Sequence, residues 1–346
     1  MKVAAASLPH LRLDARPRAT RRARDFVALM KPRVMLLAVF TAFVGLAIAP
    51  VRVSPLSGIV AMFAIATGAG AAGMLNMWYD ADVDALMART ARRPIPRGAV
   101  SRTEALAFGL FLGCGAVAVL ALMLNAAAGA LLAFTIFFYV VIYTAWLKRR
   151  TPQNIVIGGA AGALPPVIGW VAATGRVGLE PLALFLIVFL WTPPHFWALS
   201  LNRACEYSRA GIPMLPVIAG RSATTRQILA YSLLLVPASL LPCVLGFAGT
   251  LYGTVAAAGG AIFLVLSWSL CRSAESNRRA ASRLFAFSIS YLFALFAALL
   301  ADSTVHRWST QFSALRTPNT ALSIAASSPR CALLVCSETG VRANEA

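Results

Sequence analysis

Three side chains that carry oxygen ligands, Asn76, Asp80 and Asp84, stand four residues apart at the end of a long apolar stretch. An α-helix turns about 100° per residue, so these three share one face, whereas Asp82 points to another. One amide and two carboxylates suit a hard cation such as Mg²⁺, which usually binds one or two carboxylates together with substrate phosphate oxygens. Because carboxylates at the end of a membrane helix cost free energy, the pattern predicts a functional site. The alternative is a solvated helix end that happens to be acidic.

Arginines follow the acidic residues directly, in the stretch that ends at Arg97. Since a guanidinium makes paired, charge-assisted hydrogen bonds to phosphate, we predict a Mg²⁺–diphosphate site at a membrane surface. Tyr143 and Lys148 end a later apolar segment, where they either line this site or serve only as interfacial anchors. Glu206 adds a carboxylate on the same predicted side, which would let two Mg²⁺ ions clamp one diphosphate.

The composition is that of a membrane protein, because 59% of the 346 residues are hydrophobic and only 12% are charged. We therefore predict an all-α integral membrane protein with about nine transmembrane helices around a central cavity. Each helix is expected to have close to the ~20 residues that a bilayer requires. The predicted spans are 33–51, 56–79, 103–124, 126–147, 153–174, 180–201, 227–248, 251–271 and 284–301.

The basic residues behind the net charge of +19 are placed as in a protein that crosses a membrane several times. Most of the Lys and Arg residues precede the first predicted span or lie in alternate loops, which places the N-terminus in the cytoplasm. The lipid bilayer is then the expected partner, and nucleic acid is excluded. We expect a basic arm (1–25) and a tail (302–346), both disordered, around a membrane domain (26–301). The acidic residues Asp14 and Asp25 disfavour a mitochondrial presequence, although one remains the alternative.

One histidine, His195, falls within a predicted span. A histidine in a membrane is either a hydrogen-bonded structural group or part of a functional site. The neighbouring Trp191, Phe196 and Trp197 favour a wall for a large, flat aromatic substrate.

The sequence resembles the UbiA superfamily of intramembrane prenyltransferases, and within it the members that farnesylate haem. The superfamily pattern is N-x-x-x-D-x-x-x-D, which begins at Asn76. Five further stretches match the haem-farnesylating members in order, and the resemblance extends over residues 26–301. They are R-T-A-R-R-P-I-P-R-G (89–98), Y-T-A-W-L-K-R (143–149), P-P-V-I-G-W (165–170), W-T-P-P-H-F-W-A-L (191–199) and A-G-I-P-M-L-P-V (210–217).

This resemblance implies a reaction in the cell inner membrane: transfer of a farnesyl group from farnesyl diphosphate to a vinyl group of haem B, giving haem O. It also implies a haem A synthase or a terminal oxidase assembly factor as a partner. The implied site has Mg²⁺ on Asn76, Asp80, Asp84 and Glu206, diphosphate on Arg93, Arg97, Lys148 and Arg203, and haem against His195, Trp191 and Trp197, with Tyr143 beside the reacting groups.

The sequence departs from the family at Cys205-Glu206-Tyr207, where Asp-Asp-Tyr or Lys-Asp-Tyr is usual. Glutamate reaches one methylene further, which changes the geometry of the second acidic cluster. Two other functions fit part of the pattern. One is prenyl transfer to another aromatic acceptor, such as a quinone precursor. The other is a transporter in which the acidic residues couple transport to an ion.

Overall fold

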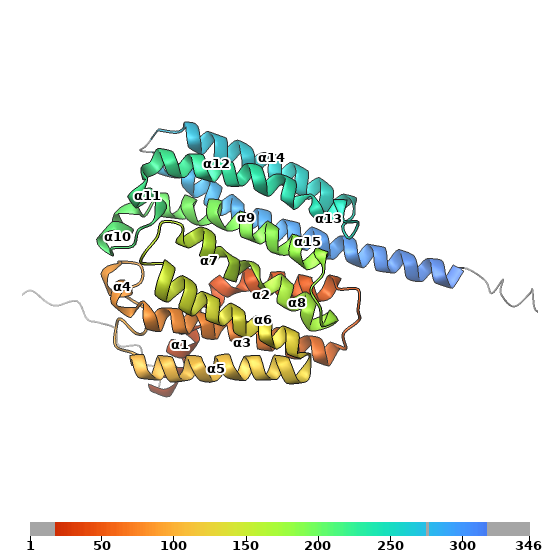
Figure 1. The fold of residues 1–346 in the computed structure, drawn as a ribbon, viewed down its shortest axis with the longest axis horizontal. Helices are drawn as coiled ribbons and strands as arrows, with labels where there is room; N and C mark the ends of the chain where they lie inside the picture. Colours follow the sequence, from red (N-terminus) through yellow and green to blue (C-terminus); the bar gives the residue numbers. More distant parts are fainter. Residues whose placement is uncertain (1–17, 275–276, 317–346) are drawn as a thin grey trace, which may run out of the picture. The chain divides into compact units, whose positions relative to one another are not determined.

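The computed structural model describes residues 18–274 and 277–316, with side-chain surroundings for 22–274 and 277–304. In this part of the chain all regular structure is helical (Figure 1). The elements are α1 (Arg18–Leu29), α2 (Pro32–Ile48), α3 (Pro55–Tyr79), α4 (Ala81–Leu86), α5 (Arg102–Met123), α6 (Ala126–Phe137), the π-helix η1 (Phe138–Leu147), α7 (Asn154–Ala163), α8 (Pro165–Thr174), α9 (Leu179–Leu201), α10 (Ala204–Arg209), α11 (Leu215–Ile218), α12 (Gly220–Ser239), α13 (Leu241–Val244), α14 (Thr250–Arg272) and α15 (Arg278–Arg316).

Eight helices of the described chain are long and apolar enough to cross a membrane, and a ninth span arises if α1 and α2 count as one bent pair. Arg22–Leu29 and Pro32–Ile48 meet at an angle of 50°. The bend follows from Lys31-Pro32, because a residue before proline is disfavoured in the right-handed helical region. The protein is therefore a multi-pass helical membrane protein, as the composition predicts.

The fifth predicted span is two helices, α7 and α8, that meet just before Pro165. Small residues allow α8 to lie against the backbone of α2. A Cβ on Gly169 would collide with the carbonyl oxygen of Ala42, so only glycine permits this approach. The close packing fixes α8 beside the first span.

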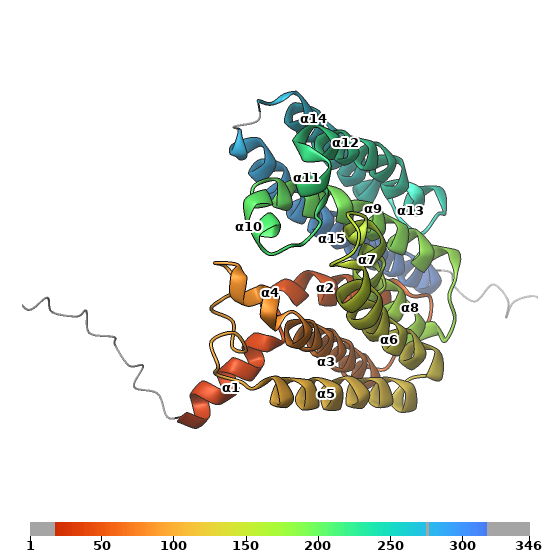
Figure 2. The same ribbon diagram turned by 60° about the vertical axis from the view of Figure 1, so that its left-hand side comes forward.

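The helices form two groups that are visible in Figure 2. In one group α3 and α5 pack together, with α6 beside them. In the other group α9, α12, α14 and α15 surround the largest cluster of buried apolar side chains. Helix α7 packs against both η1 and α9, so it connects the groups.

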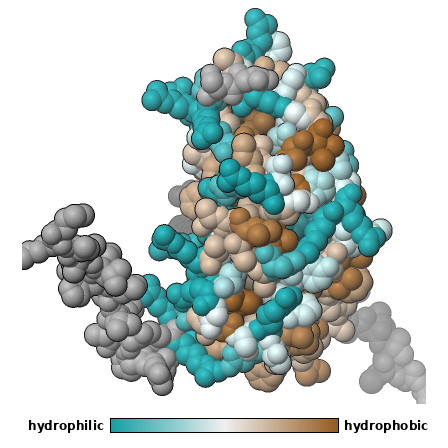
Figure 3. All heavy atoms as spheres, turned by 90° about the vertical axis from the view of Figure 1, so that its left-hand side faces the viewer, coloured by the Kyte–Doolittle hydropathy of each residue, from teal (hydrophilic) through white to brown (hydrophobic). Residues whose placement is uncertain are grey.

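The segments that connect the spans alternate between the two ends of the bundle. The connections that contain α4, α10 and α11, together with the start of α7, gather at one end (Figure 1). Figure 3 views this end, where hydrophilic side chains lie around smaller hydrophobic patches. The predicted phosphate-binding residues belong to these segments.

Helices extend into both of the segments that were expected to be disordered. Helix α1 begins at Arg18, and the ion pairs Arg22–Glu104 and Arg97–Asp25 attach it to the body. At the other end α15 runs to Arg316, because the sequence after Asp302 has no proline or glycine before Pro318. Residues 1–17 and 317–346 lie outside the described part of the chain, as do 275–276 between them.

Candidate active site

Asn76, Asp80 and Asp84, together called the acidic column below, lie where α3 ends and α4 begins. Helix α3 ends at Tyr79, but the backbone hydrogen bonds Asp80 N–Asn76 O (3.0 Å) and Asp84 N–Asp80 O (2.8 Å) preserve the four-residue repeat. Asp80 and Asp84 are consequently 1% and 3% exposed, whereas the Asp82 side chain is 55% exposed. The sequence spacing thus places the three predicted side chains on one buried face and Asp82 outside it.

Three basic side chains neutralise this column. Lys148 Nζ pairs with Asp80 Oδ2, and Arg93 Nη1 lies 2.5 Å from Asp84 Oδ2. Lys31 Nζ donates a 2.6 Å hydrogen bond to the Asn76 amide oxygen. Asn76 in turn donates to Asp80 Oδ2 at 2.9 Å. Lys148 and Arg93 were predicted from the sequence, and Lys31 was not.

Lys31 has a backbone conformation that few residues adopt. Its φ of 52° makes it the only non-glycine residue with a positive φ in the described chain. Strain of this kind costs about 1–3 kcal/mol and tends to occur at functional sites. Removal from water lowers the pKa of the Lys31 ammonium to about 7, and the charges of Arg93 and Lys148 act in the same direction. The bend between α1 and α2 therefore has a direct consequence for the site, because it directs a lysine onto Asn76.

Arg149 covers the column from outside. Its guanidinium makes two hydrogen bonds to Asp82, of 2.8 and 2.9 Å, and lies 3.8 Å from Asp80 Oδ1. It also stacks over the Tyr79 ring, 5.0 Å from the ring centre. The hydrogen bond from Arg149 holds the pKa of the Asp82 carboxyl below its ordinary value. Asp82 thus contributes indirectly, by holding a cation close to Asp80.

The π-helix η1 contacts the acidic column through Thr144. Its wider turn lets Thr144 donate to the Tyr139 carbonyl oxygen (2.7 Å) and accept from Asn76 Nδ2 (3.0 Å). Tyr143 stacks on Tyr139 with ring centres 5.4 Å apart. A Cβ on Gly158 would collide with the Tyr143 ring, so this glycine leaves room for the tyrosine. Short π-helical insertions are frequent at functional sites.

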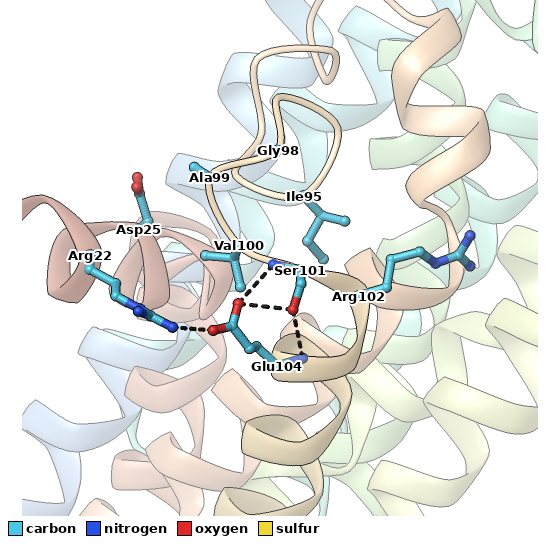
Figure 4. Close-up of a pocket in the computed structure, with 9 residues that line it drawn as sticks. All are labelled: Arg22, Asp25, Ile95, Gly98, Ala99, Val100, Ser101, Arg102 and Glu104. Atoms are coloured by element: carbon cyan, nitrogen blue, oxygen red, sulfur yellow. Dashed lines mark hydrogen bonds and ion pairs between the residues drawn. The ribbon is translucent and has the colours of Figure 1, made fainter.

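Arg97 does not join this cluster. It pairs with Asp25 of α1, on the far side of the loop that follows α4. Near it lies an open pocket of about 680 Å³, in which Glu104 bonds Arg22 and Ser101 (Figure 4). Ser101 and Glu104 satisfy each other's backbone groups at the start of α5, so these contacts cap a helix. None of the residues that line this pocket belongs to the acidic column.

The second predicted cluster lies on α10 and is more open. Glu206 is one-third exposed, with Oε1 3.7 Å from Arg203. Arg89 lies between the two clusters, since its charge interacts with Asp84 and Arg93 and also with Arg203 and Tyr207. Partial removal from water, followed by the charge of Arg93, lowers the pKa of the Arg89 guanidinium.

The donor set can be tested for a divalent cation. In the described residues no three Asp, Glu, His or Cys side chains converge closely enough to form a protein-only metal site. Mg²⁺ does not require one, because it keeps waters and binds substrate phosphates through one or two carboxylates. Asp80 Oδ1 is buried without a hydrogen-bond partner, and so is Glu206 Oε2. A carboxylate oxygen left in this state is available to a cation, so Asp80 fits Mg²⁺ bound together with a diphosphate, and Asp84 lies on the same buried face.

His195 lies deeper, between α9 and α15. Its ring stacks on Trp191 at 4.3 Å and on Phe285 at 4.6 Å, and its Nδ1 lies 2.7 Å from Ser288 Oγ. Trp197 lies on another face of α9, where it is 1% exposed and contacts the Tyr231 ring edge-on. The structure thus brings Trp191 and His195 together and places Trp197 in the core.

Sequence reasoning missed four residues of these two sites. Lys31 precedes the first predicted span and was not singled out, although Lys-Pro at a helix start indicates a bend. Thr144 and Arg149 lie within the Y-T-A-W-L-K-R stretch, beside the residues that were singled out. Ser288 carries no signal, because it is one serine in an apolar helix.

The fold and the site define a helical membrane enzyme with an acidic cluster, lined by cations, at one end of the bundle. The model of the UbiA prenyltransferase family matches residues 38–293. The chain belongs to this family.

Similar proteins agree with this assignment. Protoheme IX farnesyltransferase 1 of Mesorhizobium japonicum is 61% identical over 285 residues, which is 82% of this chain and 92% of that protein. The protoheme IX farnesyltransferase of Parvibaculum lavamentivorans is 57% identical over 84% of this chain and 92% of its own length.

Solved structures share the fold at low identity. A structure of digeranylgeranylglyceryl phosphate synthase gives a TM-score of 0.69 at 19% identity, over 82% of this chain and 99% of that one. A UbiA homologue from Archaeoglobus fulgidus, bound to GPP and Mg²⁺, gives 0.60 at 16% identity, over 80% and 99%.

Proposed function

We propose that this protein transfers the farnesyl group of farnesyl diphosphate to a vinyl group of haem B and thereby forms haem O. The observation that carries this proposal is the identity of 57–61% to protoheme IX farnesyltransferases over about nine-tenths of their length. The acidic column would bind the diphosphate, and the aromatic rings around His195 would contact the haem.

The diphosphate would bind at the column through the cations that surround it. Lys148 and Arg93 already hold the two buried carboxylates, and Arg149 lies beside Asp80. A diphosphate would share these cations, since fixed positive charges that face a leaving group stabilise the charge that develops on it. Lys31 and Thr144 form hydrogen bonds to the two ends of the Asn76 amide. The amide is therefore already oriented before a ligand binds.

Asp80 and Asp84 would hold Mg²⁺, with Asn76 and Glu206 as the further oxygen donors. When bound there, Mg²⁺ would neutralise negative charge on the departing diphosphate. Arg97 is not included among the diphosphate ligands, because it pairs with Asp25 of α1 and not with the column. Arg203 would assist only if diphosphate displaces its contact with Glu206.

The farnesyl group leaves as an allylic cation, which needs an apolar and aromatic environment. The stacked rings of Tyr139 and Tyr143 lie on η1, where the charge of Asp80 acts on both hydroxyl groups. Their faces can stabilise a cation, and the surrounding helices exclude water. The vinyl carbon of haem would attack this cation to form the new carbon–carbon bond. Water would then add to the resulting haem cation and lose a proton, which completes the hydroxyethylfarnesyl group.

The acceptor would lie beside His195 and Trp191, whose rings stack on each other. We further propose the bacterial inner membrane as the location, since the matched relatives are bacterial. A haem A synthase or a terminal oxidase assembly factor would be the partner that receives haem O.

The test is a reconstitution of the reaction. Purified protein in detergent is incubated with Mg²⁺, farnesyl diphosphate and haem B, and products are identified by mass spectrometry. A product with the mass of haem O is expected, and its formation should stop on omission of either substrate. If haem B stays unmodified while an aromatic acid that is a quinone precursor is prenylated under the same conditions, the proposal is wrong.

A further inference from the structure

The hydrogen bonds around His195 determine where its ring proton lies. Ser288 Oγ has two close partners, the Phe285 carbonyl oxygen and His195 Nδ1, each at 2.7 Å. The Phe285 oxygen can only accept, so the single hydroxyl proton of Ser288 must point to it. Otherwise two oxygen atoms would face each other at 2.7 Å without a proton between them. Ser288 Oγ is then an acceptor toward His195, and Nδ1 must carry the ring proton.

Both faces and one edge of the imidazole are therefore fixed by the protein. Trp191 and Phe285 both stack on the ring and cover its two faces. The indole nitrogen of Trp191 also donates to the Ser288 carbonyl oxygen at 2.7 Å. Ser288 is fully buried, so water does not compete for these bonds. One residue of α15 thus holds both aromatic groups of α9.

The other ring nitrogen, Nε2, is the atom that can bind a metal. No described residue forms a hydrogen bond to it, and it is not among the buried polar atoms that lack a partner. With the proton on Nδ1, the Nε2 atom carries a free lone pair. Histidines that bind metals commonly donate the other ring N–H to a fixed acceptor, which sets the tautomer and the ring orientation. A haem iron is an acceptor for such a lone pair.

We propose that Ser288 is a positioning residue that keeps His195 in the Nδ1–H tautomer and thereby presents Nε2 to the iron of the haem substrate. The identity of the ligand rests on the proposed function, but the tautomer does not. The two parts can therefore be tested separately.

The tautomer is tested in the substrate-free protein. The chain has only three histidines, so ¹⁵N-histidine labelling gives a simple spectrum. The signals of His195 are those missing from a His195→Gln variant. We expect correlations of a protonated Nδ1 and an unprotonated Nε2 in the unmodified protein, and a mixture of tautomers in Ser288→Ala. A protonated Nε2 in the unmodified protein would overturn the inference, whatever reaction the protein catalyses.

The ligand is tested by absorbance titration with two macrocycles. Ser288→Ala should weaken haem B binding about 10- to 100-fold, as is typical when a partner of a metal-binding histidine is removed. Binding of metal-free protoporphyrin IX should not change, because it has no iron. Equal weakening for both macrocycles would reduce Ser288 to a packing residue and overturn the proposal.

Two further variants control for damage to the fold. Ser267→Ala removes another fully buried hydroxyl, which lies 2.9 Å from that of Ser232 and does not contact His195. It should leave both titrations unchanged. Ser288→Thr keeps a hydroxyl at the same position and should restore the haem spectrum and affinity that Ser288→Ala loses. If Ser288→Thr behaves like Ser288→Ala although it folds, the hydroxyl has no such role.

Discussion

Replacing Asp80 and Asp82 separately tests whether Asp80 belongs to the acidic column and Asp82 lies outside it. Asp80→Asn keeps the shape of the side chain and removes its charge, and Asp82→Asn makes the same change two residues later. Asp80 is 1% exposed and pairs with Lys148, whereas the Asp82 side chain is 55% exposed and pairs only with Arg149. The two variants therefore differ in burial and in partner but not in chemistry.

The magnitudes follow from these surroundings. Removing one partner of a buried ion pair costs about 3–5 kcal/mol, because the other charge is left without compensation. At about 1.36 kcal/mol per tenfold change, such a loss in the transition state lowers the rate by roughly 10²- to 10⁴-fold. An exposed pair contributes about 0.2–1 kcal/mol, so Asp82→Asn should cost less than about tenfold. Asp82→Asn should still have some effect, because it releases Arg149 from its position 3.8 Å from Asp80.

The assay is the initial rate of farnesylated haem formation at saturating Mg²⁺, measured by mass spectrometry. Size-exclusion chromatography and thermal unfolding in detergent confirm that each variant is folded. Equal losses in the two variants would refute the one-face reasoning. So would an Asp80→Asn protein that keeps more than about a tenth of the activity.

Three further predictions concern the surroundings of the column. Arg93→Ala should raise the KM for farnesyl diphosphate about 10- to 100-fold, because a hydrogen bond to a charged group is worth about 1.5–3 kcal/mol. Arg97→Ala should change it little, since Arg97 already pairs with Asp25; a larger effect of Arg97→Ala would contradict the assignment. Gly158→Ala should push Tyr143 aside and cost about 1–3 kcal/mol in thermal unfolding, whereas Gly162→Ala, where a Cβ would meet nothing within 4 Å, should be neutral. Chelation of divalent cations should abolish turnover and Mg²⁺ should restore it, and full activity in excess chelator would exclude a metal at Asp80.

The membrane class and the principal spacing were predictable because they depend on local sequence. Hydrophobic segments long enough for a bilayer must be helices, since lipid offers no partners for backbone groups. The four-residue spacing of Asn76, Asp80 and Asp84 persists across the junction of α3 and α4, because the backbone hydrogen bonds continue through it. The alternation of basic loops likewise predicted which segments gather at one end of the bundle.

Helix boundaries at the two ends of the chain were less predictable. The basic arm and the polar tail lack apolar periodicity, so both were expected to be disordered. Helix α1 nevertheless includes residues of the arm, because Phe26 and Leu29 of the same helix pack into a buried apolar cluster with residues of α3. In addition, Asp25 pairs with Arg97. This contact depends on a loop seventy residues away, which local sequence does not encode.

The partner of each charged group was decided by the tertiary structure. Sequence placed Arg93, Arg97, Lys148 and Arg203 on one side of the membrane, and all four suited a diphosphate. Only Arg93 and Lys148 contact the column, because the turns after α4 direct Arg93 inward and Arg97 toward α1. The position of the ring proton on His195 likewise depends on tertiary structure, because it is set by Ser288, which lies 93 residues further along the chain. Residue type and spacing determine what chemistry is possible, but helix packing determines which groups are within reach of one another.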